Sequence, residues 1–381
     1  MRISIVGSRG IPAQYGGFEV FTEELSTRLV QKGHQVNVSC EYKNDTHGST
    51  YKGVNLHFAP CNEPRSYSFR KLYELFADIY FMIKLARKSD VMYLLGMTAG
   101  FAAFVPKLIN WRLKIFINID GVEWKREKFN ILERTILHFN TLIAAFCCDT
   151  IVLDAQSMQK YIPKNWVKKS VFIPYGTEIG CPPIWDNSKL EPLGNKNPLI
   201  RGIVENGYWL VVARLEPENH IHMIVDGLLK SDSAKRLVVV GNFTNPQYQA
   251  KIEKILEQDK SKRVILTGGI YNNDMLLNML RNHCYAYIHG HSVGGTNPSL
   301  LEIMSMHTIV VAHDNDFNRE VCKDGALFFK TVGDLANQIN KVDQNDRGFS
   351  NLKDIALHRV EADYNWGSVV DRYEQVFLRL V

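Results

Sequence analysis

The chain reads His291-Ser292-Val293-Gly294-Gly295-Thr296-Asn297-Pro298-Ser299-Leu300-Leu301-Glu302-Ile303-Met304-Ser305 where an apolar, strand-like run over 284–288 ends. Two adjacent glycines allow a sharp turn and a close approach of the backbone to another group. Asn297 is a typical helix N-cap, and proline suits the first turn of a helix, where its missing N–H is no loss. The pattern therefore predicts a buried strand, a glycine-rich turn and a helix that begins near Pro298.

This predicted turn has the features of a nucleotide site. Free N–H groups and the dipole at a helix start attract phosphate, which makes the segment around Gly295, Thr296, Asn297 and Ser299 a candidate phosphate site. Glu302 follows one turn later, where a carboxylate would accept hydrogen bonds from a ribose diol. The alternative interpretation is a capped helix with an exposed glutamate.

Length and composition indicate a globular protein with two α/β domains. The 381 residues are too many for one ordinary core, and the 45% hydrophobic and 22% charged contents are those of a soluble protein. Residues 1–6 are typical of a buried first strand rather than a signal peptide. Residues 91–106 are largely apolar but contain Gly96, Thr98 and Gly100, so we expect strand, turn and helix there. The seven cysteines lack metal-ligand or disulfide spacing, which predicts a reducing cytosol.

Charge is unevenly distributed along the chain. Residues 1–190 contain 24 Lys and Arg against 17 Asp and Glu, whereas the remainder contains 21 against 23. A basic first half predicts an anionic partner for that half only. The sequence has no zinc-finger, RRM-type or helix-turn-helix pattern, so an anionic membrane surface is favoured over nucleic acid.

Strand-like runs alternate with helical patterns, which predicts parallel sheets wrapped by helices. We expect two Rossmann-like, doubly wound domains that face a cleft, with ligands at the carboxyl ends of the strands. Pro and Gly gather between about 180 and 206, which is a linker composition. The predicted boundaries are 1–190, a linker over 191–206, a second domain over 207–364 and a crossover helix over 365–381. The strand candidates are 3–7, 35–40, 54–59, 91–95, 114–119, 150–153, 171–174, 208–213, 236–241, 264–267, 284–288, 309–312 and 326–329.

Three further motifs lie at predicted strand ends. A glycine-rich loop over 7–19 ends in Gly16-Gly17 before a helix and differs from the G-x-G-x-x-G of dinucleotide folds. Arg214 follows a strand, where a planar guanidinium can clamp a pyrophosphate, although an ion pair with Glu216 or Glu218 is the alternative. The backbone of Gly268-Gly269 would either form a wall against a nucleobase or be an ordinary turn.

In this order and spacing the motifs resemble family 4 of the GT-B glycosyltransferases, over nearly the whole chain. The resemblance is closer to a bacterial surface-polysaccharide subgroup that includes β-1,4-rhamnosyltransferases. It rests on the segments Arg9-Gly10-Ile11-Pro12-Ala13, Tyr15-Gly16-Gly17-Phe18-Glu19, Asp120-Gly121-Val122-Glu123-Trp124-Lys125-Arg126 and Gly295-Thr296-Asn297-Pro298-Ser299-Leu300.

The resemblance implies an N-terminal acceptor domain, a C-terminal donor domain and transfer with retention at the anomeric carbon. Arg214 and the amides of 295–299 would stabilise the leaving diphosphate, Glu302 would bind the ribose, and Gly16 and Gly17 would shape the phosphate side. Two positions depart from the wider family. Gly294 stands where a glutamate is usual, and Asn219 where a lysine is usual.

The resemblance also implies an acceptor side. Asp120 aligns with the strand end that faces the reacting sugar, so it is the candidate to position or deprotonate the acceptor hydroxyl. Glu123 and Arg126 would join it. The alternatives are an Asp120 that caps the next turn, and surface pairing of the other two with Lys125 and Glu127.

No metal or cofactor is expected beyond the nucleotide diphosphate sugar itself. Asp314-Asn315-Asp316 has the D-x-D pattern of metal-dependent transferases. However, GT-B enzymes of this kind stabilise the leaving phosphate with arginine and helix amides.

The region 68–89 predicts a basic amphipathic helix, which can lie on anionic lipid or be an ordinary surface helix. The resemblance favours lipid, because such enzymes act on polyprenyl-diphosphate-linked glycans. We therefore expect a cytoplasmic protein, peripheral at the inner face of the bacterial plasma membrane, with dTDP-L-rhamnose as the preferred donor.

Two other classes of function remain open at this point. A GT-B sugar-nucleotide epimerase or hydrolase would share the nucleotide site but would need no acceptor. A non-catalytic nucleotide- or glycan-binding relative would explain Gly294 and Asn219. An NAD-dependent enzyme is less favoured than either, for want of the dinucleotide motif.

Overall fold

A computed structural model describes residues 1–13, 16–41, 48–61, 64, 67–96, 98–119, 130–180, 183–271 and 273–381. It divides into two compact units. The first comprises Met1–Gly176 together with Trp366–Val381, and the second is Thr177–Asn365. The predicted acceptor residues Asp120, Glu123 and Arg126 lie outside the described residues.

The first unit is built on an eight-stranded sheet with the order β3-β4-β2-β1-β5-β6-β7-β8. All neighbouring strands are parallel except β3 and β4. Each strand predicted in this half is present, and among the residues described here only the short β3 was not predicted. The strands are β1 (Arg2–Val6), β2 (Gln35–Cys40), β3 (Thr50–Tyr51), β4 (Val54–Phe58), β5 (Val91–Leu95), β6 (Lys114–Asn118), β7 (Thr150–Leu153) and β8 (Ser170–Phe172).

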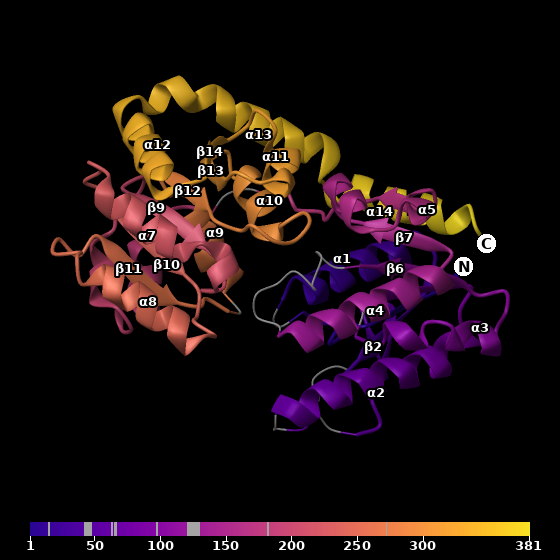
Figure 1. The fold of residues 1–381 in the computed structure, drawn as a ribbon. Helices are drawn as coiled ribbons and strands as arrows, with labels where there is room; N and C mark the ends of the chain where they lie inside the picture. Colours follow the sequence, from indigo (N-terminus) through magenta and orange to yellow (C-terminus); the bar gives the residue numbers. More distant parts are fainter. Residues whose placement is uncertain are drawn as a thin grey trace. The chain divides into compact units, whose positions relative to one another are not determined.

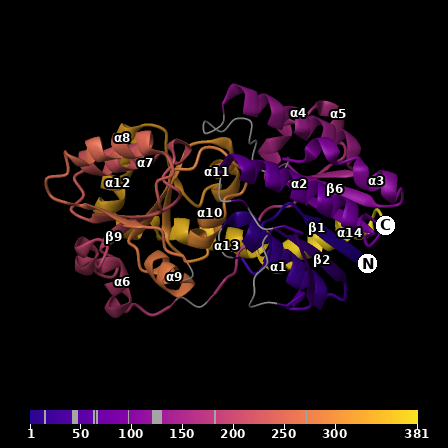
Figure 2. The same cartoon turned by 90° about the horizontal axis from the view of Figure 1, so that it is seen from below.

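Helices cover both faces of this sheet (Figures 1 and 2). Because crossovers between parallel strands are right-handed, connections running in opposite directions along the sheet lie on opposite faces. Helix α1 connects β1 to β2 on one face, whereas α2, α3 and α4 lie on the other face (Figure 2). The helical segments are α1 (Gly17–Gln31), α2 (Tyr67–Ala86), η1 (Gly100–Ala102), α3 (Val105–Ile109), α4 (Ile131–Cys147), η3 (Gln156–Tyr161) and α5 (Lys164–Val167).

The C-terminal helix α14 (Trp366–Leu378), predicted as a crossover helix over 365–381, packs into the core of the first unit. Trp366, Val369, Val370, Tyr373 and Phe377 are all buried there. The hydroxyl groups of Tyr373 and Tyr93, a residue of β5, lie 3.0 Å apart and can share a hydrogen bond. The chain therefore ends inside the unit in which it began.

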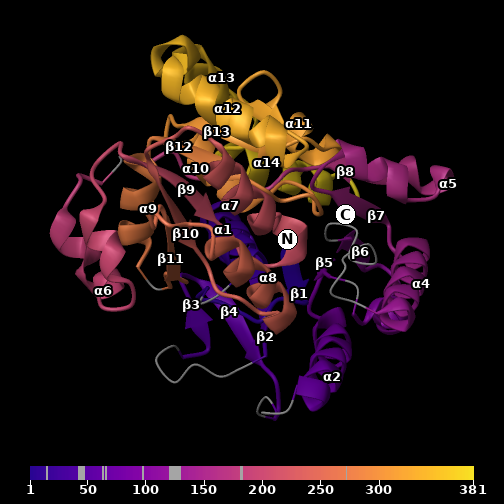
Figure 3. The same ribbon diagram turned by 60° about the vertical axis from the view of Figure 1, so that its left-hand side comes forward.

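The second unit is built on a fully parallel sheet with the order β11-β10-β9-β12-β13-β14. Figure 3 shows its strands from β13 at the top to β11 at the bottom. The order is that of a dinucleotide-type Rossmann sheet. The strands, all predicted, are β9 (Tyr208–Val212), β10 (Arg236–Val240), β11 (Val264–Gly268), β12 (Ala286–His289), β13 (Ile309–His313) and β14 (Leu327–Phe329).

Helices again cover the sheet on two faces. Helix α7 packs on both α8 and α12, whereas α10 packs on α13. The core between the sheet and α7 contains Trp209, Ile224, Val239 and Ile288, all fully buried. The helices are α7 (Ile221–Lys230), α8 (Pro246–Leu256), α9 (Asp274–Asn282), α10 (Pro298–Met304), α11 (Asp316–Cys322), α12 (Val332–Gln344) and α13 (Ser350–Asp363), with the 3-10 turns η6 (Pro217–Asn219) and η7 (Asp346–Phe349).

The predicted boundary at 190 differs from this division, which falls between Gly176 and Thr177, so the predicted linker over 191–206 lies within the second unit. Short helical segments occupy the region: η4 (Asn187–Leu190), α6 (Glu191–Gly194) and η5 (Pro198–Gly202). Two of the prolines that suggested a linker, Pro192 and Pro198, stand in first helical turns, where proline is favoured. Buried Leu193 and Ile200 hold the segments in place. The Asn197 side chain also donates a 3.1 Å hydrogen bond to the Leu266 carbonyl of β11.

Candidate functional site

The candidate site lies in the second unit, at the point where the strand order reverses. Strands β9 and β12 are neighbours at the centre of the sheet, and their connections leave in opposite directions. Ligands of doubly wound sheets bind at such a switch point, beyond the carboxyl ends of the strands. The loops after β9 and β12 contain Arg214 and the predicted glycine-rich turn, so the fold brings these two motifs to one place.

Hydrogen bonds join the two loops. The backbone N–H and the hydroxyl of Ser292 both donate to the carbonyl of Glu218, at 3.0 and 2.9 Å. The Nδ1 atom of His220 lies 2.8 Å from the carbonyl of Gly290. A Cβ atom on Gly290 would overlap the carbonyl of Asn219, so this approach requires glycine. The loops after β9 and β12 are therefore joined, and we call the two together the connected rim.

Arg214 is exposed immediately beyond β9, whereas Glu216 and Glu218 are buried. The carboxylate of Glu216 accepts a 3.0 Å hydrogen bond from the Thr244 hydroxyl. The sequence left open an ion pair between Arg214 and a nearby glutamate. For Glu216, the structure shows the hydrogen bond from Thr244 instead. The guanidinium of Arg214 is thus presented to solvent at the switch point.

Asn219, which stands where related enzymes have lysine, has a structural role here. It is buried, and its side-chain amide donates a 2.7 Å hydrogen bond to the carbonyl of Arg214. This bond closes the turn that carries Arg214. A lysine at this position would place an ammonium group in a buried environment, which costs free energy unless the charge is paired.

The glycine-rich turn has the predicted cap. The Oδ1 atom of Asn297 accepts hydrogen bonds from the N–H of Ser299 at 3.0 Å and from its hydroxyl at 2.8 Å. The N–H of Ser299 is therefore engaged within the protein, which differs from its predicted use as a phosphate ligand. Thr296 is buried beside it. Gly294 has φ of 128°, a conformation that side chains with a Cβ rarely adopt.

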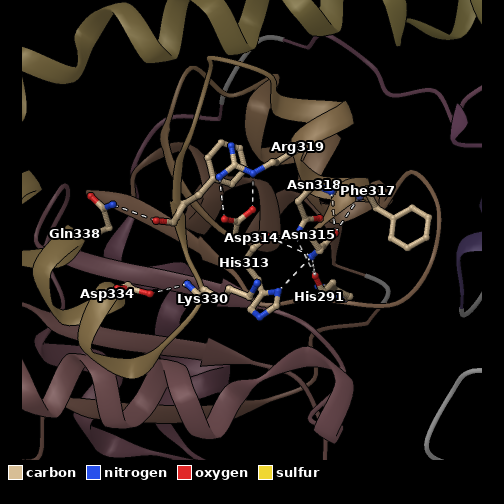
Figure 4. Close-up of polar contacts among 11 residues, drawn as sticks. His291, His313, Asp314, Asn315, Phe317, Asn318, Arg319, Lys330, Asp334 and Gln338 are labelled. Atoms are coloured by element: carbon tan, nitrogen blue, oxygen red, sulfur yellow. Dashed lines mark hydrogen bonds and ion pairs between the residues drawn. The ribbon is translucent and has the colours of Figure 1, made fainter. Parts of the chain in front are cut away.

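A small hollow is formed by this turn and the segment that begins α11. Asn315 and Asn318 each donate a 2.9 Å hydrogen bond from the side-chain amide to the carbonyl of His291 (Figure 4). Asn315 also caps α11 by accepting from the N–H groups of Phe317 and Asn318. Sequence reasoning missed both asparagines, although Asn315 is recognisable as an N-cap. The hollow is lined by His291, Ser292, Val293, Gly294, Gly295, Asn297, Asn315, Phe317 and Asn318.

The D-x-D segment is held by other contacts. Asp314 forms an ion pair with the guanidinium of Arg319, and this hydrogen-bonded partner lowers the pKa of the aspartate (Figure 4). The middle residue is the helix cap Asn315. These contacts give Asp314 and Asn315 local structural roles.

Glu302 is paired with an arginine that the sequence did not suggest. Its carboxylate forms an ion pair with Arg281, a buried residue at the end of α9. The same guanidinium donates a 3.1 Å hydrogen bond to the side chain of Asn278. Burial raises the pKa of Glu302, and the Arg281 charge opposes that shift. The Glu302 side chain as a whole is 36% exposed, whereas its carboxyl group lies at the buried end, against Arg281.

The turn at Gly268 and Gly269, predicted to lie beside a nucleobase, is held by Asn242, which follows β10. Gly268 has φ of 73°, and the N–H of Gly269 donates a 2.8 Å hydrogen bond to Asn242. The same asparagine donates from its amide to the hydroxyl of Tyr271 at 3.2 Å. A Cβ atom on Gly269 would overlap the Tyr271 ring. The Tyr271 ring therefore covers this turn. Asn242 and Tyr271 were not predicted as site residues.

Stacked histidines lie beside the rim. The rings of His289 and His291 have centroids 4.4 Å apart, and those of His220 and His313 are 4.3 Å apart. Burial lowers the pKa of His289 well below its usual range and that of His313 to about 4. Burial therefore favours the neutral form of both rings in the unliganded protein.

The predicted glycine pair of the first unit lies at the corresponding switch point of its own sheet, between β1 and β5. Gly16 has φ of 115° and directly precedes α1. The carbonyl of Gly17 accepts a 2.6 Å hydrogen bond from the hydroxyl of Tyr175. The turn is thus fixed at the start of the helix, as predicted.

Comparisons with known proteins agree with this architecture. Residues 202–356 match the family of glycosyl transferases group 1, and residues 1–178 match a domain of unknown function, DUF1972. No curated protein matches the sequence of this chain.

Solved structures show the same fold at low sequence identity. HepE from Anabaena, solved with UDP-glucose, is 14% identical with a TM-score of 0.75, and 100% of each chain is covered. Sucrose-phosphate synthase from Thermosynechococcus elongatus is 15% identical with a TM-score of 0.79, covering 100% of this chain and 98% of the other. A glycosyltransferase from Rickettsia africae is 13% identical with a TM-score of 0.73, covering 100% and 98%.

The rim at the switch point of the second unit therefore belongs to the domain that matches the group 1 transferases. Two Rossmann-like sheets, the C-terminal helix that returns to the first unit and the structural neighbours are those of the GT-B fold. The protein is a glycosyltransferase of the GT-B fold with a C-terminal glycosyl transferases group 1 domain.

Proposed function

We propose that this enzyme transfers a sugar from a nucleotide diphosphate donor to a lipid-linked glycan during the synthesis of a cell-surface polysaccharide. The observation that carries the donor half of the proposal is the connected rim at the β9/β12 switch point. It presents the exposed Arg214 together with the glycine-rich turn. A guanidinium and backbone N–H groups are the donors that stabilise a developing diphosphate charge.

The proposed roles follow from the positions of the residues. Arg214 and the amides of Gly295, Thr296 and Asn297 would bind the diphosphate. Glu302, held by Arg281, would accept hydrogen bonds from the ribose. Gly268 and Gly269, covered by Tyr271, would lie against the base. Gly16 and Gly17 would shape the phosphate side from the first unit.

The proposed reaction is retaining. The bond between the anomeric carbon and the diphosphate oxygen breaks, and the acceptor oxygen bonds to that carbon on the same face. The proton of the acceptor hydroxyl passes to the leaving phosphate. Asp120 would position that hydroxyl, or take up its proton first and pass it to the phosphate, with Glu123 and Arg126 on the acceptor side. No metal ion is required, because Arg214 supplies positive charge at the diphosphate.

L-rhamnose from dTDP-L-rhamnose is the preferred donor. The support for it is the resemblance of the glycine-rich segments to rhamnosyltransferases of surface polysaccharides. HepE, one of the structural neighbours, has been solved with UDP-glucose, which supports a nucleotide sugar in general. The proposed acceptor is a polyprenyl-diphosphate-linked glycan at the inner face of the bacterial plasma membrane. No helix within the described residues is long and apolar enough to cross a membrane.

A donor screen tests the proposal. The purified chain is incubated with dTDP-, UDP- and GDP-sugars and a polyprenyl-diphosphate-GlcNAc acceptor, and the lipid products are analysed by mass spectrometry. A gain of one deoxyhexose from dTDP-rhamnose alone is expected. A gain from a different donor would overturn the rhamnose assignment. Free nucleotide or an altered donor without any lipid product would indicate hydrolase or epimerase chemistry instead.

A further inference from the structure

His220 lies where three strand ends of the second unit meet. It belongs to the loop after β9 and directly precedes α7, with φ of 50°. Its Nδ1 atom lies 2.8 Å from the carbonyl of Gly290, in the loop after β12. Its ring stacks on that of His313, the last residue of β13, with the centroids 4.3 Å apart and the planes inclined by 6°. The side chain is therefore part of the connected rim.

The hydrogen bond to Gly290 determines how the ring of His220 is protonated. A carbonyl oxygen only accepts, so Nδ1 must carry a hydrogen. In the neutral ring Nε2 is then unprotonated, and it can take up a proton without breaking the bond to Gly290. The charged ring would donate to that carbonyl through a stronger, charge-assisted hydrogen bond. His220 can therefore become an imidazolium without rearrangement.

The surroundings of His313 favour a neutral ring instead. The Oδ1 atom of Asn315 caps α11, so the NH2 group of this amide is the one that lies 3.3 Å from Nδ1 of His313 (Figure 4). A proton on Nδ1 would set two donors against each other. Burial also lowers the pKa of His313 to about 4.

Stacking permits one proton on the two rings and opposes a second. A flat cation is attracted to the face of an aromatic ring. Two charged rings at this separation would repel each other, so their protonation is coupled. The favoured charged state of the stack is therefore a protonated His220 beside a neutral His313.

The charged groups around the stack come from several elements. Glu218 is buried in η6, two residues before His220. Asp314, beside His313, is held by Arg319. The other titratable groups around these rings are His222, Asp226, Lys251, His289, His291 and Lys330.

None of the carboxylates in the described ranges is ion-paired with His220. The histidines that the structure does pair with carboxylates there are His34, His283 and His307. A cation without a counter-charge from the protein gains most from an anionic ligand. An imidazolium at His220 would therefore receive its counter-charge from whatever binds at the rim.

We propose that His220 binds the diphosphate of the donor as an imidazolium and takes up its proton when the donor binds, with neutral His313 as its stacking partner. This inference rests on the proposed function, which assigns the connected rim to that diphosphate. Negative charge beside the ring favours its protonated form. Because coupling between two ligands is reciprocal, protons must in turn tighten donor binding.

Isothermal titration calorimetry of the full chain tests the proposal. The probes are dTDP-L-rhamnose, UDP-glucose and GDP-mannose, whose diphosphates are esterified at both ends and have no group that titrates near neutral pH. Titrations in buffers of different ionisation enthalpy measure the protons taken up. We expect the wild type to take up at most about one proton, and its affinity to fall by at most about tenfold for each unit rise in pH.

His220→Asn removes the titratable group with little change in the backbone. Asparagine tolerates positive φ, and its amide can donate to the Gly290 carbonyl. This variant should take up no proton, and its affinity for the donor should be roughly tenfold lower at acid pH and independent of pH. His220→Lys carries a permanent cation, so it should bind the donor tightly but without pH dependence.

Two further variants locate the proton. His313→Phe keeps a flat ring against His220 and should retain the proton uptake. His222→Asn is the matched control, because His222 is the neighbouring histidine whose Nδ1 lies 3.0 Å from the hydroxyl of Tyr248. It should also retain the uptake.

Proton uptake that persists in His220→Asn, or that is lost in His313→Phe, would overturn the assignment to His220. Donor binding by the wild type without proton uptake would overturn the inference and leave the proposed function standing. Uptake that depends on His220, with no transfer of sugar to the lipid acceptor, would support the inference and reject the proposed function. If none of the three donors binds, both are rejected.

Discussion

The carboxylate of Glu302 is ion-paired with the buried guanidinium of Arg281, 21 residues earlier in the chain. The pair connects the end of α9 to α10, the helix that follows the glycine-rich turn in the chain. A glutamate proposed to bind ribose is therefore also the counter-charge of a buried arginine. Its two roles can be separated by the choice of substitution.

Glu302→Gln removes the charge but keeps an acceptor oxygen for Arg281, so it should weaken donor binding by about 1–3 kcal/mol and lower the free energy of unfolding by less than Glu302→Ala does. Glu302→Ala should in addition lower the free energy of unfolding by about 3 kcal/mol, because it leaves Arg281 buried without its partner. Calorimetric titration with dTDP and urea unfolding measure the two effects. Glu257→Gln, an exposed position on α8, is the control. Wild-type dTDP affinity in Glu302→Gln would remove Glu302 from the ribose site.

Arg214→Ala should lower kcat/KM by at least about a hundredfold and leave the unfolding midpoint unchanged. The side chain is exposed, so its removal uncovers no buried group, whereas a paired contact to a developing phosphate charge is lost. Steady-state kinetics and thermal unfolding are the measurements. Arg379→Ala removes an exposed arginine at the end of the chain and should affect neither. A rate within a fewfold of the wild type would contradict the assignment.

Asn297→Ala and Asn245→Ala form a matched pair. Each removes a side chain that caps a helix, α10 or α8, and each should cost about 1 kcal/mol of stability. Only Asn297→Ala should also weaken donor binding, since only that cap orders the glycine-rich turn. Equal donor affinity in the two variants would place the diphosphate elsewhere.

Gly294→Glu should fail to restore the glutamate of related enzymes. The φ of 128° at this position is strained for a residue with a Cβ, by about 1–3 kcal/mol, although the space around it is open. We expect a lower unfolding midpoint and no gain in rate. Gly333→Ala, at a helical glycine with room for a Cβ and no positive φ, should be neutral or stabilising. An increase in turnover for Gly294→Glu would show that the turn can adopt the usual geometry.

Acid should destabilise the second unit through its buried histidines. Burial lowers the pKa of both His222 and His313 to about 4, from 6.5. Between these values the unfolded chain binds protons that the folded unit does not, so stability falls as pH is lowered from about 6.5 towards about 4. Urea midpoints at pH 7 and pH 5 measure the loss. His222→Gln should reduce it, and an unchanged loss would show that His222 does not contribute.

Local patterns in the sequence were sufficient for the strands, the glycine turns and the helix starts. The alternation of apolar runs depends on neighbours in the chain, and a cap such as Asn297 bonds to a residue only two positions away. The strand order of the sheets was not predicted, because the single hand of parallel crossovers fixes the face on which a connecting helix lies and not which strands are neighbours. The approximate position of the proposed donor site was predictable, because Arg214 and the glycine-rich turn follow the carboxyl ends of β9 and β12.

Contacts between distant segments decided the rest. Glu302 pairs with Arg281, and two asparagines donate hydrogen bonds to the carbonyl of His291. These contacts join segments that are separate in the chain, so no spacing within either segment predicts them. The same holds for α4. A surface helix normally buries its large apolar residues, but the close approach of Gly100 to Asn140 leaves room only for small side chains, and Ile131, Leu132, Ile136, Phe139 and Phe146 of α4 are exposed. The sequence determined which segments form helices and strands, because that choice depends on near neighbours. Tertiary packing determined which face of each segment is buried, because that depends on the shape of its partner.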